Sequence, residues 1–179
     1  MPTKRTKTES KKPERAAPRL SLAVQYAVDE PALPTRAQFR RWVVAALAKH
    51  GATRAAITLR IVGSVEGRLL NSRYRRQRHA TNVLSFGYDM EPSSRQRKII
   101  SGDIVLCAPV IAREARAQRK TLAAHYAHLT VHGMLHLQGY DHQRDSDANR
   151  MERLETAILE RLGWANPYLP DAFANGPFV

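Results

Sequence analysis

The sequence of 179 residues is short of cysteine, of long apolar runs and of acidic residues. Its single cysteine excludes an internal disulfide framework and is typical of a protein in a reducing compartment. No apolar run approaches the ~18 residues that cross a membrane, and residues 1–19 lack the apolar core of a secretory signal. We therefore expect a cytoplasmic protein that has no membrane partner.

Acidic residues are outnumbered by basic ones, 16 against 29, which gives a net charge of +13. This excess predicts a polyanionic partner such as a nucleic acid, although it says nothing about the fold. Lysine, arginine and proline are concentrated in residues 1–19, which we expect to form a disordered basic arm. Residues 20–168 are then one domain, long enough for a real core, and residues 169–179 are a C-terminal tail.

The spacing of apolar residues predicts both strands and helices. Strands are expected at residues 20–28, 55–61, 82–88 and 99–107. Helices are expected from Thr35 to a stop at Gly51, from Ser64 past Tyr74, from Pro109 onward, at 121–138 and at 146–162. Because the two kinds mix without a regular β-α-β rhythm, we predict an α+β fold with a single small mixed β-sheet and helices packed on it.

Three local details of this outline can be predicted. Thr35 and Gln38 have the spacing of a capping box at the start of the first helix. Ser64 is the candidate cap of the second helix, whose core-facing side chains are predicted to be Leu69, Leu70 and Tyr74. Gly102 indicates a bulge or kink in the last strand.

The histidines are concentrated in one segment. Five of the seven lie in residues 125–142, which include the string HGMLHLQGYDH. On a helix, positions i and i+4 share a face, so His132 and His136 can reach one ion together. Gly139 is suited to end that helix and to bring His142 back toward the pair. Three imidazoles leave the fourth position of a tetrahedral Zn²⁺ to water, so we predict one catalytic zinc ion per chain, bound by a helix at the cleft.

Other interpretations of these residues remain open. A histidine pair can be a hydrogen-bonded couple without metal, and a closed zinc site needs a fourth ligand, for which Asp141 and Cys107 are the candidates. His125 and His128 are expected to be hydrogen-bonded core histidines, with His128 alternatively a partner of a metal ligand. Gly133 stands where zinc proteases of the His-Glu-x-x-His type carry their general base, which disfavours peptide hydrolysis.

The histidine string resembles the signature of the YbeY family of bacterial endoribonucleases, which are rRNA maturation factors. Further segments that resemble the family are LNSRYR at 70–75, TNVLSF at 81–86, GDIVLC at 102–107, MERLE at 151–155 and NPY at 166–168. The resemblance covers residues 20–168 and implies that they form the catalytic domain.

The resemblance implies an activity and partners. The activity is that of a zinc-dependent, single-strand-specific endoribonuclease that acts in the 3′-end processing of small-subunit rRNA and in ribosome quality control. The implied partners are RNA, the small ribosomal subunit and an assembly GTPase. Two other functions stay open: a zinc metallopeptidase or hydrolase, and a non-catalytic zinc-containing ribosome-assembly factor that binds rRNA through its charge.

Five arginines stand in residues 68–78 with no acidic residue among them. A solvated helix face accounts for the first two, but guanidinium groups also bind phosphate bidentately. By resemblance, Arg75 matches a functionally important arginine of the family, and we predict that it is the catalytic residue that holds or stabilises the scissile phosphate. Arg76 and Arg78 are predicted RNA contacts. The chain departs from the family at residues 78–80, where family members commonly carry an acidic residue and a proline.

The nucleophile and the general acid stay undecided at this point. Zinc lowers the pKa of a water toward ~7, or the RNA's own 2′-hydroxyl attacks while the metal polarises the phosphate. The candidates for the general acid are Asp141, Tyr140 and Ser85, although Tyr140 and Asp141 are better suited to support the turn before His142.

Overall fold

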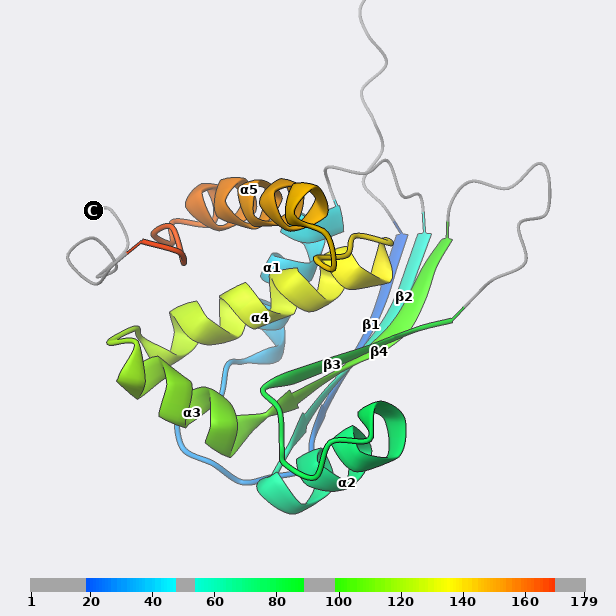
Figure 1. Cartoon of the computed structure of the whole chain (residues 1–179), viewed down its shortest axis with the longest axis vertical. Coiled ribbons are helices and arrows are strands. Elements are labelled where there is room, and N and C mark those ends of the chain that lie inside the picture. Colours follow the sequence, from blue (N-terminus) through cyan, green and yellow to red (C-terminus); the bar gives the residue numbers. More distant parts are fainter. Residues whose placement is uncertain (1–18, 48–53, 89–98, 170–179) are drawn as a thin grey trace, which may run out of the picture.

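A computed structural model describes residues 19–47, 54–88 and 99–169 of the chain. These residues form one four-stranded β-sheet and five helices (Figure 1). In chain order the elements are β1 (Arg19–Tyr26), α1 (Arg36–Leu47), β2 (Arg54–Val62), α2 (Ser64–Arg75), β3 (Val83–Gly87), β4 (Ile99–Cys107), α3 (Ala108–Ala117), α4 (Leu122–Leu137) and α5 (Asp145–Arg161). The predicted basic arm and C-terminal tail lie outside the described residues, except for Arg19 and Leu169.

The sheet is mixed, as predicted. Its strand order is β1-β2-β4-β3, with β1, β2 and β4 parallel and β3 antiparallel to β4 at one edge. The pairing of β4 is continuous through Gly102, which pairs with Ile57 of β2 and Gly87 of β3, so the predicted bulge is wrong. A Cβ at Gly102 would lie 2.4 Å from the Phe86 carbonyl oxygen and 2.7 Å from Leu137 Cδ2. Glycine is therefore needed there for the close approach of β3 and α4.

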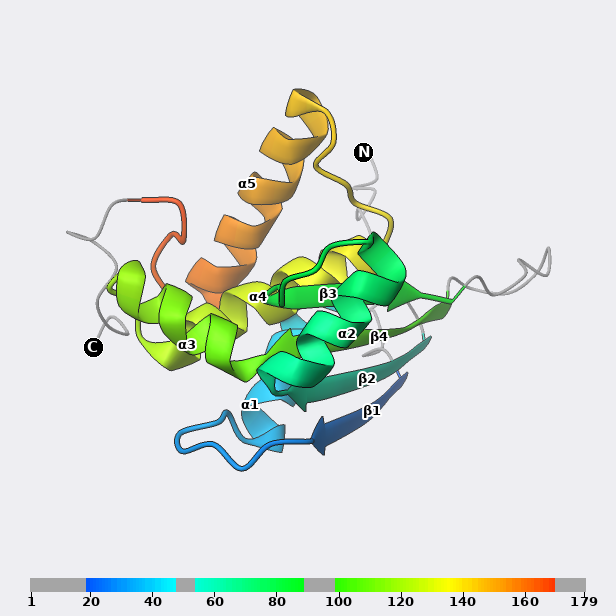
Figure 2. The same ribbon diagram turned by 60° about the horizontal axis from the view of Figure 1, so that its bottom comes forward.

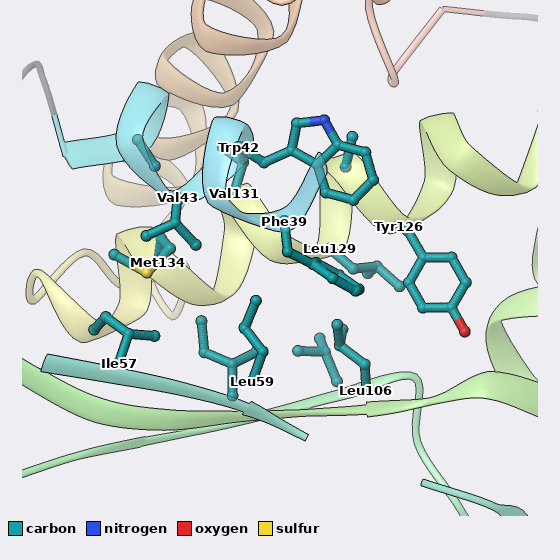
Figure 3. Packing of buried hydrophobic residues seen from close by; sticks show 14 of the residues in the cluster. Phe39, Trp42, Val43, Ile57, Leu59, Leu106, Tyr126, Leu129, Val131 and Met134 are labelled. Atoms are coloured by element: carbon teal, nitrogen blue, oxygen red, sulfur yellow. The ribbon is translucent and has the colours of Figure 1, made fainter. Parts of the chain in front are cut away.

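Helices cover both faces of the sheet (Figure 1, Figure 2). α1 and α4 pack on one face, α5 packs on α4, and α2 lies on the other face. The main core lies between the sheet, α1 and α4, where Phe39 meets Tyr126 and Trp42 edge to face with ring centroids 6.1 and 5.3 Å apart (Figure 3). A smaller apolar cluster around Val105 and Cys107 lies under α2. α4 is thus packed against the sheet and against the three helices α1, α3 and α5.

The two predicted N-terminal caps have different outcomes. The amide of Thr35 donates to Gln38 Oε1 at 2.8 Å, and the amide of Gln38 donates to Thr35 Oγ1 at 3.3 Å, which confirms the capping box of α1. The predicted stop at Gly51 lies outside the described residues. In α2 the N-cap residue is Gly63 and no side chain caps the helix, so Ser64 is the first helical residue and not the cap.

The buried face of α2 also differs from the prediction. Of its three predicted core residues, only Leu70 packs against the core, while Leu69 and Tyr74 are 62% and 57% exposed. The buried residues are Gly67 and Asn71. A Cβ at Gly67 would lie 2.9 Å from the cysteine sulfur at the end of β4. The helix therefore contacts the sheet through a glycine and an asparagine one turn apart. The spacing of apolar residues could not predict this face, because neither residue belongs to the apolar pattern.

Both ends of α4 are defined by single residues. Its N-cap is Thr121, whose Oγ1 accepts a hydrogen bond from the amide of Ala124 at 3.2 Å. After its C-terminus, Gly139 has a φ of +88°, a conformation that favours glycine and stops the helix as predicted. The preceding helix, α3, has Pro109 in its first turn, also as predicted. Within the described ranges, none of the helices has both the length and the apolar character of a membrane span.

Candidate metal centre

Three histidine rings meet at the C-terminal end of α4. His132 and His136 lie on the helix, and His142 lies in the segment between α4 and α5. The Nε2 atoms of His132 and His136 are 3.1 Å apart. The ring of His142 is centred 5.6 Å from that of His132 and 5.0 Å from that of His136. One nitrogen from each ring lies within 4.8 Å of the others, so the structure brings the three predicted ligands together.

A hydrogen-bonded turn returns His142 to the helix. The amide of Tyr140 donates to the carbonyl of Leu135 at 3.1 Å. The amide of His142 donates to Asp141 Oδ1 at 2.7 Å. Tyr140 and Asp141 therefore support the turn, as predicted.

Hydrogen bonds assign the tautomers of two of the rings. His136 Nδ1 lies 3.0 Å from the carbonyl oxygen of Tyr140, and His132 Nδ1 lies 2.7 Å from Glu155 Oε1. A carbonyl or carboxylate oxygen only accepts, so each Nδ1 carries a proton and donates it, and in the neutral form of each ring Nε2 then keeps the lone pair. Burial, together with the nearby His132 and His142, lowers the pKa of His136 and favours its neutral form.

The positions of these lone pairs indicate whether the site can bind a metal ion. When both rings are neutral, these two Nε2 atoms 3.1 Å apart have no hydrogen to share. A cation held by them and by the third ring satisfies both, and three imidazole nitrogens with an open fourth position are the ligand set of a catalytic zinc site. Ligands whose other ring nitrogen donates to a carboxylate or a carbonyl are also usual in such sites. The residues present therefore fit a divalent transition-metal ion.

A buried carboxylate, Glu155 of α5, stands behind this group. Its side chain is fully buried and accepts hydrogen bonds from His132 Nδ1 at 2.7 Å, from His128 Nε2 at 3.0 Å and from the hydroxyl of Tyr168. Burial raises the pKa of Glu155, but the hydrogen bonds from His128 and His132 outweigh it and lower the pKa to about 2. Glu155 is therefore a negative charge at neutral pH, and it fixes the orientation of His132.

Gly133 allows α4 to lie close to the sheet. A Cβ at this position would lie 3.0 Å from two methyl carbons of Ile104 and 3.0 Å from Ser85 Oγ. A side chain as long as glutamate has no room on this side of the helix. The general base of a zinc protease is thus not only missing from the sequence but excluded by the packing of α4 on β3 and β4.

Neither candidate for a fourth protein ligand joins the group. Cys107 is buried in the apolar cluster under α2, on the other face of the sheet. Asp141 is the acceptor for the amide of His142. The group of possible ligands that the described residues contain consists of the three histidines alone, which leaves a coordination position open.

A cavity of about 470 Å³ opens beside His132 and His142 and follows α4 toward its N-terminus. At its far end the buried His125 Nε2 donates to Glu114 Oε2 of α3 at 2.9 Å, and Asn82 Nδ2 donates to the same oxygen at 2.9 Å. Burial lowers the pKa of His125, and the hydrogen bond to Glu114 offsets part of the change. His125 is a hydrogen-bonded core histidine, as predicted.

The predicted arginines lie apart from the histidines. Arg75, Arg76 and Arg78 are exposed at and after the end of α2, and α2 lies on the opposite face of the sheet from α4. None of the three lines the cavity. Strand β3 separates the two groups, since Phe86 contacts the ring of Tyr74 at 4.8 Å between centroids, whereas Ser85 faces α4. The catalytic role of Arg75 and the RNA contacts of Arg76 and Arg78 stay predictions.

Sequence reasoning did not assign a role to Glu155 or Glu114. A signal for Glu155 was available, because it falls four residues after Met151 and three before Ile158, on the buried stripe of the last helix. A charged residue at a core position is rare unless it is paired. No comparable signal marks Glu114, which is a partly buried residue on the cavity side of α3.

Comparison with known proteins supports the resemblance noted in the sequence. A family model described as Endoribonuclease YbeY matches residues 25–163. An endoribonuclease YbeY from Nitrosomonas europaea is 53% identical over 150 residues, which cover 84% of this chain and 85% of that protein. The protein of the same name from Bordetella pertussis is 54% identical over 159 residues, covering 86% of this chain and 98% of that protein.

A solved structure agrees with the fold. The solution structure of a protein from Thermotoga maritima superposes with a TM-score of 0.52 at 18% sequence identity, covering 79% of this chain and 91% of that chain. At this identity the likeness bears on the fold alone, and it supports the α+β assignment.

Proposed function

This chain belongs to the YbeY family of endoribonucleases, and on that premise we propose that it is a zinc-dependent enzyme that cleaves single-stranded regions of rRNA. The observation that carries the metal dependence is the pair of Nε2 atoms of His132 and His136, 3.1 Å apart, with His142 beside them. Zinc is favoured over other ions because three neutral imidazoles with one open position match its tetrahedral preference.

We propose that one group of residues in the chain binds the metal ion and that another group binds the RNA. A zinc ion in this site supplies Lewis acidity, either to a phosphoryl oxygen or to a water. Glu155 and the carbonyl of Tyr140 orient the ligands His132 and His136. We propose that Arg75 holds or stabilises the scissile phosphate, which requires the strand to pass over the edge strand β3 between α2 and the histidines.

Single-stranded RNA is the substrate that suits an open cavity and a basic surface. The bases of a loop or an end can leave the stack, whereas an A-form duplex hides them. The net charge of +13 favours a polyanion, and Arg76 and Arg78 are the proposed RNA contacts beside Arg75. We further propose, from the family alone, that residues 20–168 form the catalytic domain, that it acts at the 3′ end of small-subunit rRNA and in ribosome quality control, and that the small ribosomal subunit and an assembly GTPase are its partners.

The decisive experiment is the cleavage of a structured rRNA fragment by metal-loaded protein, metal-stripped protein and the Arg75→Ala variant. We expect cleavage within single-stranded regions by the loaded protein, loss with chelator, and recovery when zinc is returned. Arg75→Ala should lower cleavage far more than binding if the guanidinium acts on the transition state. Arg68→Ala is the matched control, because it removes an exposed arginine from the first half of the same helix.

The same assay separates the other candidate functions. Chelator-sensitive cleavage of a casein-type substrate with intact RNA would support a metallopeptidase. Tight RNA binding without metal-dependent cleavage would support a non-catalytic assembly factor. The ends of the RNA products identify the nucleophile, because attack by the 2′-hydroxyl leaves a cyclic phosphate and attack by water does not.

A further inference from the structure

The cavity beside the histidines reaches farther than a metal site requires. Its volume of about 470 Å³ is in the range of pockets that enclose a small ligand. From His132 to His125 the helix rises by about 10 Å, seven residues at ~1.5 Å each. This distance is similar to the distance between the phosphate of a nucleotide and the far edge of the base of the same nucleotide. A phosphate bound at the histidines therefore places an adjoining base level with His125 and Glu114.

Charge decides which part of an RNA strand can enter. Three glutamates line the cavity, namely Glu114, Glu152 and Glu155. The cation among the lining residues is Lys120, whose ammonium donates to the carbonyl of Pro167 at 2.6 Å. Once a first phosphate, which carries one negative charge, is bound at the zinc ion, that phosphate and the three glutamates carry more charge than the ion and Lys120 together. A second phosphate is then disfavoured, whereas a base carries no charge. The cavity thus favours a base over the backbone.

Glu114 has acceptor capacity to spare. Its Oε2 already accepts from His125 Nε2 and Asn82 Nδ2, both at 2.9 Å. A carboxylate offers about four acceptor positions, so those on Oε1 are left for a ligand. The Glu114 side chain is 29% exposed while that of His125 is 3% exposed, which means that a buried partner holds an accessible carboxylate in place. A preorganised carboxylate of this kind is suited to read donors on a base.

An aromatic ring lines the same cavity. Tyr168 is 44% exposed, and its ring is 5.5 Å from that of His128 at an angle of 81°. Its hydroxyl donates to Glu155, so the ring is anchored. Bases that leave the stack are commonly bound on such a ring while their Watson–Crick edge is read by hydrogen bonds.

We propose that this cavity is a nucleobase pocket that receives an unstacked guanine next to the scissile phosphate and reads it through the carboxylate of Glu114. The proposal rests on the proposed function. Guanine carries a ring N–H and an amino group side by side, which are two donors for the acceptor positions that remain. Adenine and cytosine place a ring acceptor beside the amino group, and uracil flanks its N–H with two carbonyl oxygens. Each of those acceptors would face the carboxylate with a lone pair.

The test is the binding of free nucleosides to the metal-loaded, full-length protein, measured by calorimetry. Nucleosides carry no phosphate, so the signal does not depend on a contact between a phosphate and the metal. We expect guanosine to bind roughly tenfold or more tighter than adenosine, cytidine or uridine. Inosine, which lacks the amino group, and 1-methylguanosine, which lacks the ring N–H, should each bind at least about fivefold more weakly than guanosine.

A variant pair assigns the selectivity to one carboxylate. Glu114→Gln should remove the preference for guanosine, because an amide places donors where the base also donates. Glu160→Gln makes the same change of charge on an exposed face of α5 outside this cavity, and it should keep the preference. The analogue series uses the unaltered protein, so the pocket is tested even if Glu114→Gln lowers stability.

The outcomes separate this inference from the proposed function. Equal affinity for the four nucleosides, or no saturable binding of guanosine by a protein that still cleaves RNA, overturns the pocket and leaves the endoribonuclease assignment intact. Selective guanosine binding by a metal-loaded protein that leaves RNA uncut would support the proposed guanine pocket and contradict the proposed endoribonuclease activity.

Discussion

The Nδ1 atom of His132 lies 2.7 Å from Oε1 of Glu155, a fully buried carboxylate. This contact joins α4 to α5 and connects the candidate metal centre to the core. The carboxylate makes the imidazole more basic and turns its Nε2 toward the other two rings. The charged carboxylate occupies a core position where an apolar side chain would add hydrophobic stabilisation. In return it holds the ligand His132 in one orientation.

Replacing Glu155 by glutamine should weaken metal binding by about 10- to 100-fold, since an amide neither carries the charge nor accepts from both histidines. Competition with a chromophoric zinc chelator measures this change. Glu160→Gln, on the same helix but exposed, should leave the affinity unchanged. Equal affinities of the two variants would remove Glu155 from the metal centre.

Replacing His136 by alanine should abolish most metal binding, because two remaining nitrogens bind zinc far more weakly than three. Elemental analysis of purified protein should give about one zinc per chain before the change and little after it. His79→Ala is the control, since that histidine is exposed and outside the group. Full metal content in the His136 variant would contradict the assignment of His136 as a ligand.

Replacing Gly133 by alanine should lower the free energy of unfolding by about 1–3 kcal/mol, the usual cost of overpacking. The added methyl group would lie 3.0 Å from Ile104 carbons and from Ser85 Oγ, and the fully buried side chain of Ile104 has little room to move. Urea unfolding measures the loss. Adding Ser85→Ala should recover part of it by removing one of these contacts, and no recovery would show that the strain lies elsewhere.

The metal-free protein should lose stability between about pH 4.5 and pH 2. The folded-state pKa of Glu155 is lowered from 4.5 to about 2, so the unfolded chain takes up the proton first as the pH falls. The contribution of Glu155 is complete above pH 4.5 and is lost as the pH falls toward 2. We expect a loss on the order of a few kcal/mol, measured by urea unfolding across this range. Glu155→Gln should show a smaller loss.

The salt dependence of RNA binding should report the arginines after α2. For single-stranded RNA the log–log slope is about −0.7 per phosphate contacted, so Arg76→Ala and Arg78→Ala should each make the slope less negative by about 0.7. Fluorescence anisotropy over a range of salt concentrations measures it. An unchanged slope in both variants would show that the strand follows another path.

Sequence by itself determined the features that depend on local spacing. The histidines at i and i+4, the glycine stop and the returning third histidine follow from helix geometry over eleven residues, and the structure brings them together. The element types and the capping box of α1 are likewise local, because the periods of helices and strands are short. The family followed from the same short motifs.

Only the tertiary structure decided which distant residues meet. Glu155 contacts His132 across 23 positions and Glu114 contacts Asn82 across 32, and no periodic pattern specifies such pairs. Arg75 ends α2, which lies across β3 from the helix that carries His132 and His136. Leu69 is exposed because α2 packs through a glycine and an asparagine. Such choices depend on the shape of the opposing surface, which exists only after the chain has folded.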